Sequence, residues 1–284
     1  MSQVRVLVAL ALASLVLLGC AVLDEKQREW IFQPGDRSWG DPVAATQGMD
    51  DVWIDVPAGA GSAPERLHGL WMDGARPDAP VVLYLHGARW NIAGSAFRMR
   101  RLNALGFAVL GIDYRGFGKS SMALPSEESA YQDARVAWDW LARRHPQRHR
   151  LVFGHSLGGA IAITLASRVD DERGTWVEGT FTSIRDVIAT MRWGWLPIGP
   201  LLTQRFDAQQ RVGAIGSPLL VVHGEADQLI HPDLGRRLFD AARDPKAFVL
   251  VPGGSHHNAQ AVGMEQVRQA VGQLFGVRPW EPAG

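Results

Sequence analysis

A run of nine residues, numbers 151–159, constrains the fold of this chain more than any other feature. Three apolar residues lead into Gly-x-Ser-x-Gly with Ser156 at its centre, and a helix-compatible apolar segment follows at residues 160–166. Strand, sharp turn and helix in this order are typical of a nucleophile elbow. The turn is so tight that the positions two residues before and after the serine must lack side chains, and Gly154 and Gly158 occupy them. The sequence therefore predicts that Ser156 is a catalytic nucleophile.

Apolar runs alternate with helix-compatible segments on both sides of this turn. Continuous runs such as residues 81–85 are typical of parallel strands that are buried on both faces. Because such strands alternate with helices, we predict the α/β fold class, with a mostly parallel sheet flanked by helices. The expected strands are residues 52–56, 67–72, 81–85, 107–112, 151–153, 177–181, 219–222 and 247–251. The expected helices are residues 92–105, 127–144, 157–166, 232–242 and 259–274.

Composition narrows the classes of function. The chain has 284 residues, enough for one large α/β domain, which we assign to residues 50–284. Basic and acidic residues number 29 each, so the chain lacks the excess of positive charge that would indicate a nucleic acid as partner. Cys20 is the only cysteine, which excludes an intrachain disulfide and a cysteine-based zinc site. His231 has no ligand partners at metal spacing, and we predict no metal and no cofactor.

The amino terminus has the pattern of a targeting or membrane segment. Residues 6–23 carry no charge over 18 positions, which is too hydrophobic for a soluble surface helix. The run contains Leu17-Leu18-Gly19-Cys20, which resembles the lipobox of bacterial lipoproteins, in which the cysteine is lipidated. An uncleaved signal anchor is the alternative. We expect residues 1–23 to tether the protein on the exported side of a bacterial envelope, and residues 24–49 to form a linker.

Two later loops carry the other groups that a serine nucleophile needs. The hydroxyl needs a base to take its proton, and the base needs an acid to orient it. Asp227 follows the expected strand 219–222, and His256 follows the expected strand 247–251. Ser, Asp and His in this order, each just past a strand, form a known arrangement of catalytic triads. We expect Ser156 to attack a carbonyl carbon, His256 to transfer the proton and Asp227 to hold the imidazole.

Each partner of the serine has a rival. His257 lies next to His256, and the Gly-x-His spacing favours His256 as the base. Asp186, soon after the expected strand 177–181, is the alternative acid. Asp227 fits better, because it comes directly after a strand that ends in glycine.

Acyl transfer also needs two backbone donors for the oxyanion that forms on the attacked carbonyl. Leu157, the residue after the nucleophile, is expected to supply one amide. Ala88, just after the turn at residues 86–87, is expected to supply the other. Both amides would then come from turns at the carboxyl ends of strands, where open α/β sheets bind their ligands.

Five short motifs together resemble the α/β-hydrolase superfamily, and most closely its serine-aminopeptidase-like branch of small, N-terminally membrane-anchored hydrolases. They are His86-Gly87, the segment 113–120 (DYRGFGKS), Gly154-His155-Ser156-Leu157-Gly158-Gly159, His223-Gly224-Glu225-Ala226-Asp227 and Gly253-Gly254-Ser255-His256. The resemblance covers roughly residues 50–275. It implies the α/β-hydrolase fold, with an eight-stranded sheet whose first strand or two are antiparallel. The region that many relatives use for a large lid is short here, so we expect residues 184–217 to form a small cap.

The function expected from these features is that of a serine hydrolase that cleaves carboxylic esters or thioesters through an acyl-Ser156 intermediate. Its substrate would be a small molecule or an acylated compound. A serine peptidase or amidase is the alternative within the same class. A non-catalytic, membrane-tethered binding protein on a hydrolase fold is the alternative outside it. In the cap, Trp193, Trp195 and Phe206 either line a pocket or pack the cap onto the domain.

Overall fold

One eight-stranded sheet organises the part of the chain that the structure describes, residues 18–36, 40–57, 63–192 and 194–277 of a computed structural model. The strand order is β1-β2-β4-β3-β5-β6-β7-β8. The strands are β1 (Asp50–Val56), β2 (Glu65–Met72), β3 (Val81–Leu85), β4 (Ala108–Ile112), β5 (Arg150–His155), β6 (Glu172–Glu178), β7 (Leu219–Gly224) and β8 (Lys246–Val251). Strand β2 runs antiparallel to both neighbours, and the other neighbours are parallel. The predicted mostly parallel sheet is confirmed.

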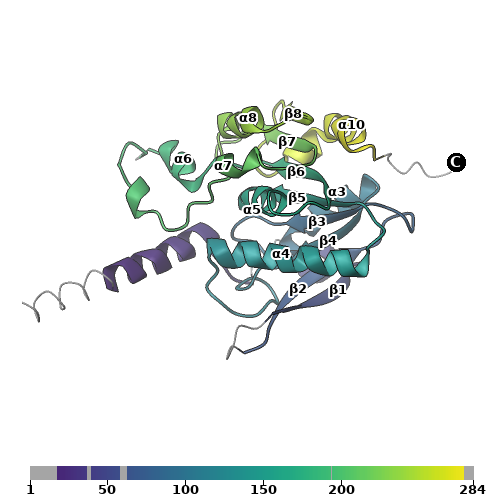
Figure 1. Cartoon of the computed structure of the whole chain (residues 1–284), viewed down its shortest axis with the longest axis horizontal. Coiled ribbons are helices and arrows are strands. Elements are labelled where there is room, and N and C mark those ends of the chain that lie inside the picture. The colour runs from purple at the N-terminus through teal and green to yellow at the C-terminus, as the bar shows by residue number, and fades with distance from the viewer. Residues whose placement is uncertain (1–17, 37–39, 58–62, 193, 278–284) are drawn as a thin grey trace, which may run out of the picture.

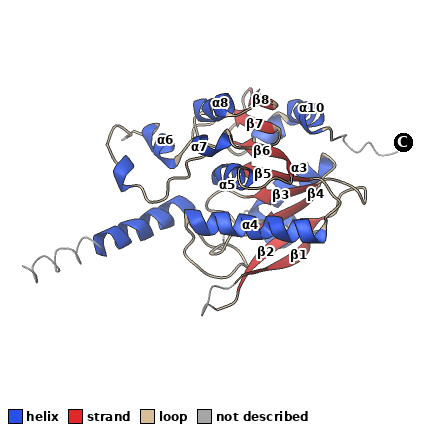
Figure 2. Ribbon diagram, viewed as in Figure 1, coloured by secondary structure: helices blue, strands red, loops and turns tan. Residues whose placement is uncertain are grey.

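Helices cover both faces of this sheet (Figures 1 and 2). They are α2 (Pro42–Ala45), α3 (Ala96–Ala104), α4 (Glu127–Arg144), α5 (Leu157–Ala166), α6 (Ile184–Ala189), α7 (Gln209–Val212), α8 (Pro232–Ala241), α9 (Ala259–Val262) and α10 (Met264–Phe275), with short 3₁₀ turns η1 (Ala93–Ser95) and η2 (Gly199–Leu201). Alternate residues of a strand face opposite sides of a sheet. Accordingly Leu83 packs in a core with α4 and α5, and Tyr84 packs in a second core with α3 and α10.

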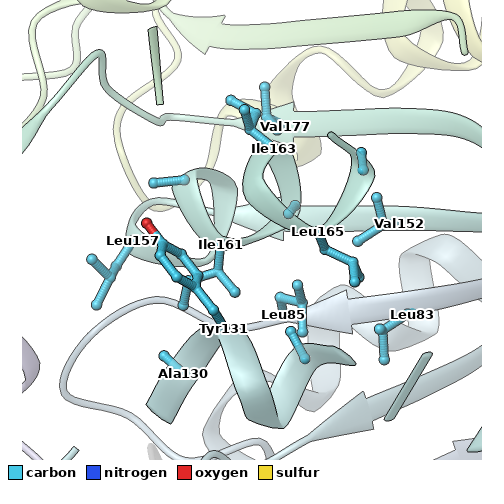
Figure 3. Close-up of a cluster of buried hydrophobic side chains, with 14 of the residues drawn as sticks. Leu83, Leu85, Ala130, Tyr131, Val152, Leu157, Ile161, Ile163, Leu165 and Val177 are labelled. Atoms are coloured by element: carbon cyan, nitrogen blue, oxygen red, sulfur yellow. The ribbon is translucent and has the colours of Figure 1, made fainter. Parts of the chain in front are cut away.

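Helix α5 is the central element of the first core. All ten of its residues are buried, as expected for a helix without a polar face. Figure 3 shows Ile161 and Leu165 of this helix among Leu83 of β3 and Tyr131 of α4. Because the helix packs against both the sheet and the neighbouring α4, its first turn is held in place, and with it the serine that precedes it.

Several predicted boundaries differ from the structure for identifiable reasons. The strand expected at 177–181 lies earlier, at β6, because its first half is polar and its apolar signal is weak. The buried Glu172 carboxylate there accepts hydrogen bonds from the Thr175 and Ser217 hydroxyls. The closing helix expected at 259–274 is divided at Gly263, where a Cβ atom would lie 2.6 Å from Val251 Cγ2.

The segment 24–49 was expected to be a linker, but much of it is ordered structure. Residues 18–32 are helical, and this helix extends outward from the sheet (purple in Figure 1). Phe32 at its end is fully buried, with its ring centroid 6.5 Å from that of Phe117 and 5.7 Å from that of Phe206. The contact explains the order, because a buried aromatic side chain fixes the backbone that carries it. The first 17 residues lie outside the described part of the chain.

Candidate active site

Ser156 lies on a strained turn between β5 and α5. Its backbone has φ 56° and ψ −121°, a region that residues other than glycine rarely adopt. A Cβ atom on Gly158 would lie 2.1 Å from the Leu85 carbonyl oxygen, and one on Gly154 would lie 2.2 Å from the Gly158 carbonyl oxygen. Neither contact is possible, so both glycines are required by the fold, as the motif predicts.

Three hydrogen bonds to the Ser156 backbone hold this turn. The Ser156 amide donates to the Glu178 carbonyl oxygen at 2.9 Å. The Ser156 carbonyl oxygen accepts from the Gly159 amide at 2.9 Å and from the Thr180 hydroxyl at 2.9 Å. A strained conformation persists only when the surrounding structure determines it. These three bonds supply that restraint. The Ser156 hydroxyl does not cap the helix that follows it.

The loops after β7 and β8 bring Asp227 and His256 together. Asp227 Oδ2 lies 2.7 Å from His256 Nδ1, and Asp227 Oδ1 accepts from the amides of Leu229 at 2.9 Å and Ile230 at 2.8 Å. Both side chains are buried. When Nδ1 donates to the carboxylate, the imidazole keeps a lone pair on Nε2 and can accept a proton there.

The electrostatic environment keeps the Asp227 carboxyl ionised. Burial raises the pKa of Asp227, but the nearby imidazoles of His223 and His256 outweigh it and hold the pKa well below its usual range. His223, four residues earlier on β7, is itself fully buried, and its Nε2 lies 3.4 Å from Asp227 Oδ2. A charged carboxylate at this position can orient an imidazole and stabilise its cation.

A short segment at the end of β6 connects the serine with this pair. Glu178 and Thr180 hydrogen-bond to the Ser156 backbone, and Gly179 lies between them. Gly179 has a φ of +57°, and a Cβ atom there would lie 3.3 Å from His256 Nδ1 and 3.5 Å from Asp227 Oδ2. The serine and the Asp–His pair therefore contact the same three-residue segment, so the structure gathers the three predicted residues at one edge of the sheet.

The predicted oxyanion donors lie on turns that flank the serine. A Cβ atom on Gly87 would lie 3.1 Å from Ser156 Cβ, so the turn that carries Ala88 packs directly against the serine. Buried His86 holds this turn, since its Nδ1 lies 2.7 Å from the Gly87 carbonyl oxygen. Leu157 begins α5, where the backbone amides of the first turn have no partner within the helix.

Comparisons with known proteins show which family this chain is similar to. A family model described as serine aminopeptidase, S33, matches residues 76–196. The uncharacterized protein Rv2307c of Mycobacterium tuberculosis is 30% identical over 270 residues, which cover 92% of this chain and 91% of that protein. The lysophosphatidylserine lipase ABHD12 of Danio rerio is 31% identical over 217 residues, which cover 69% of this chain and 56% of that protein. The Pyrococcus furiosus esterase Pf2001 shares the fold, with a TM-score of 0.68 and 19% identity over 86% of this chain and 95% of that chain.

The chain belongs to the α/β-hydrolase superfamily. The predicted family is confirmed, and its fold explains why the site lies where it does. In an α/β hydrolase the reacting groups stand on loops that follow the carboxyl ends of parallel strands. Here those loops follow β3, β5, β7 and β8. These four strands lie side by side in the sheet, with only β6 inserted, between β5 and β7.

His257 and Asp186, the alternative base and acid, lie in different environments from His256 and Asp227. His257 is exposed, and its ring packs edge-on against His256 with centroids 5.2 Å apart. Asp186 lies in α6, where its Oδ2 accepts from the Thr182 hydroxyl at 2.5 Å and from Arg237 Nη2 at 3.1 Å. Of the two candidate acids, it is Asp227 that hydrogen-bonds to a histidine of the loop after β8.

The cap residues divide between packing and exposure. Phe206 is fully buried, and its ring centroid lies 5.7 Å from that of Tyr131 in α4. Trp195 is 74% exposed, and Trp193 lies outside the described residues. Phe206 therefore fastens the cap to the domain and does not line an open pocket.

Sequence reasoning missed two buried charged residues next to this site, Arg98 and Glu178. Arg98 is 4% exposed, and its Nη2 lies 3.5 Å from Glu178 Oε1. The signal was available for Arg98, since it shares one face of its helix with buried Met99 and Leu102. A charge on the apolar face of a helix indicates a buried partner.

Proposed function

We propose that this protein is a serine hydrolase that cleaves carboxylic esters or thioesters. The observation that carries the proposal is the 2.7 Å contact between Asp227 and His256, on loops that adjoin the strained turn of Ser156. A buried carboxylate, a histidine and a serine on an elbow have one well-known chemical use together, which is acyl transfer.

The steps follow from the roles of these groups. His256 Nε2 takes the hydroxyl proton while Ser156 Oγ bonds to the carbonyl carbon, and the carbonyl π electrons move onto the oxygen. The amides of Leu157 and Ala88 stabilise that oxyanion. The tetrahedral intermediate collapses, the bond to the leaving oxygen or sulfur breaks, and the imidazolium returns the proton to it. Water then attacks the acyl-serine with the same base, which releases the acid and restores the hydroxyl.

Relatives support an ester as the substrate class. One is a lysophosphatidylserine lipase, and a protein of the same fold is an esterase. A peptide or amide substrate is the second candidate, and the match to the serine aminopeptidase family model favours it. The same residues would serve both reactions, so the two candidates differ in the leaving group and not in the catalytic side chains.

The test is covalent labelling by a fluorophosphonate together with hydrolysis of p-nitrophenyl esters of graded chain length and of aminoacyl anilides. We expect Ser156→Ala to abolish labelling and to lower kcat by at least about 1,000-fold, because the nucleophile is absent. Ser167→Ala is the matched control, since Ser167 lies at the other end of α5 and donates to the Thr164 carbonyl oxygen. A Ser156→Ala protein that turns over within tenfold of wild type would contradict the proposal, and faster cleavage of anilides than esters would favour the peptidase.

We also propose that the amino-terminal segment tethers this enzyme to a phospholipid bilayer, by an uncleaved anchor or by lipid on Cys20. The apolar run of residues 6–23 supports the proposal. Large apolar side chains are also exposed at the same end of the molecule, with Leu18 at 64% and Val22 at 57% in the helix and Leu201 at 59% in the cap. Gln27 Nε2 donates to the Leu201 carbonyl oxygen at 2.8 Å, which joins the two segments. Within the described residues, no helix has the length and apolar character needed to cross a bilayer.

A further inference from the structure

Arg98 in α3 contacts three separate segments of the chain with one side-chain nitrogen. Its Nη2 lies 2.9 Å from His155 Nε2, 3.2 Å from the His257 carbonyl oxygen and 3.5 Å from Glu178 Oε1. The side chain is 4% exposed, so the charge is buried and needs these partners. Arg98 therefore connects the ends of β5 and β6 with the loop after β8, next to the candidate active site.

Two of these partners border the nucleophile. His155 is the residue before Ser156, and the Glu178 carbonyl oxygen accepts the hydrogen bond of the Ser156 amide at 2.9 Å. Burial, with the Arg98 guanidinium, holds the pKa of His155 well below its usual range, so the ring is neutral.

The third partner belongs to the loop that carries the proposed base. Arg98 donates to the carbonyl oxygen of His257, the residue after His256. The ring of His155 also faces this loop, since its Nε2 lies 3.0 Å from the His256 carbonyl oxygen and its centroid lies 5.0 Å from that of His256. Arg98 and His155 therefore both contact the backbone that carries His256.

Glu178 supplies the opposite charge. It is fully buried, and within the described residues neither carboxylate oxygen has a hydrogen-bond partner, which leaves the 3.5 Å ion pair with Arg98. Burial raises the pKa of Glu178, and the Arg98 guanidinium opposes that rise. Loss of Arg98 alone would leave an uncompensated buried carboxylate, which is costly for the fold. Any test must therefore separate charge balance from positioning.

We propose that Arg98 is a positioning residue that sets the His256 backbone against the turn of Ser156, so that base and nucleophile meet at reacting distance. The inference rests on the proposed function. Arg98 contacts neither the serine hydroxyl nor the imidazole of His256, and it acts through His155 and His257. Small displacements of a reacting group lower the rate steeply, by about 100-fold for 1 Å.

The decisive variant is the double change Arg98→Met with Glu178→Gln, which removes both charges at nearly constant volume. A purely structural ion pair can be replaced by neutral side chains with little loss, so in that case the double variant would keep wild-type turnover. If Arg98 positions the loop, kcat falls about 10- to 100-fold while KM changes less than about twofold, because only transition-state geometry is lost. Arg98→Lys, which keeps the charge but has no planar fork, should lose activity similarly. Arg100→Met, on the exposed side of α3, is the matched control.

A second measurement does not depend on activity. Hydrogen exchange of peptides that span residues 252–258 should be faster in the double variant than in wild type, because the hydrogen bond from Arg98 to this loop is gone, while peptides from α5 keep their protection. Turnover within threefold of wild type, or unchanged exchange in this loop, would overturn the proposal for Arg98. Failure of the proposed function would look different, since wild type and Ser156→Ala would then turn over substrate equally.

Discussion

At the scale of single residues, the site depends on keeping the carboxylate of Asp227 charged. Asp227 receives hydrogen bonds from His256 and two backbone amides and lies 3.4 Å from His223 Nε2, and these contacts outweigh the cost of its burial. Burial lowers the pKa of His86, so this ring stays neutral and can donate to the Gly87 carbonyl oxygen. Both pKa values are lowered, but for different reasons: hydrogen-bond donors stabilise the charged form of Asp227, whereas burial destabilises the charged form of His86.

The depressed pKa of Asp227 predicts a specific dependence of stability on pH. As the pH falls through about 4, the unfolded chain takes up a proton at this carboxyl before the folded protein does. The contribution of Asp227 is therefore present above about pH 5 and is lost toward pH 2. Asp227→Asn cannot show this loss, so the difference in free energy of unfolding between wild type and Asp227→Asn should shrink as the pH falls from 6 to 3, measured by urea denaturation.

Glu225 provides the control for this experiment, because it is exposed in the same loop. Glu225→Gln should stay within about 0.5 kcal/mol of wild type across the same pH range, as surface substitutions usually do. A difference between wild type and Asp227→Asn that stays constant from pH 6 to 3 would show that Asp227 is not held ionised by its surroundings.

At the scale of elements, the junction of β5 with α5 is the most constrained part of the fold. The strand is buried on both faces and the helix is buried all round, so neither can shift to relieve the strained serine between them. The two glycines that flank Ser156 meet backbone carbonyls at distances no side chain tolerates. The strain is thus maintained by packing on either side of the turn.

This constraint predicts that Gly158→Ala destabilises the protein by at least about 3 kcal/mol, because the added methyl group meets backbone and not a movable side chain. Gly216→Ala is the matched control, since a Cβ atom there has no neighbour within 4 Å. That control should change the free energy of unfolding by less than about 1 kcal/mol. Urea denaturation of both variants measures the effect, and equal stability of the two would refute the steric argument.

At the scale of the whole molecule, the amino-terminal helix and the cap form one end of the protein. Phe32 packs against Phe206 of the cap and Phe117 of the turn after β4. The ring of Phe117 in turn lies 5.0 Å from that of His86, which supports the candidate oxyanion turn. The helix of residues 18–32 is therefore connected to the loops around Ser156 through packed aromatic rings.

The proposed tether predicts that the full-length protein floats with phospholipid vesicles in a density gradient. Leu12→Lys with Val16→Lys places two charges in the apolar run, and each charge costs about 2.5–3.5 kcal/mol in a bilayer, so this variant should remain at the bottom. Met122→Lys, at a side chain that is 83% exposed on the domain, should float like wild type. Equal flotation of wild type and the double variant, or none by either, would contradict the tether.

The sequence by itself determined the features that depend on local patterns. Apolar runs and their spacing predicted the sheet and its helices, including α4 with the same bounds, because burial of a strand or helix imposes its period on neighbouring residues. Glycines two residues on either side of Ser156 predicted the elbow, because the steric demand lies within five consecutive residues. The loops of Asp227 and His256 were predictable because parallel strands end at a common edge.

The tertiary structure alone decided what depends on residues far apart in the chain. It paired His256, and not its neighbour His257, with Asp227, a choice set by loop conformation that spacing only suggested. It buried Phe206 and exposed Trp195, although both are aromatic residues of one irregular segment. It joined Arg98 to the His257 carbonyl across 159 positions. Such contacts arise from how the elements pack, and no local period or motif encodes them.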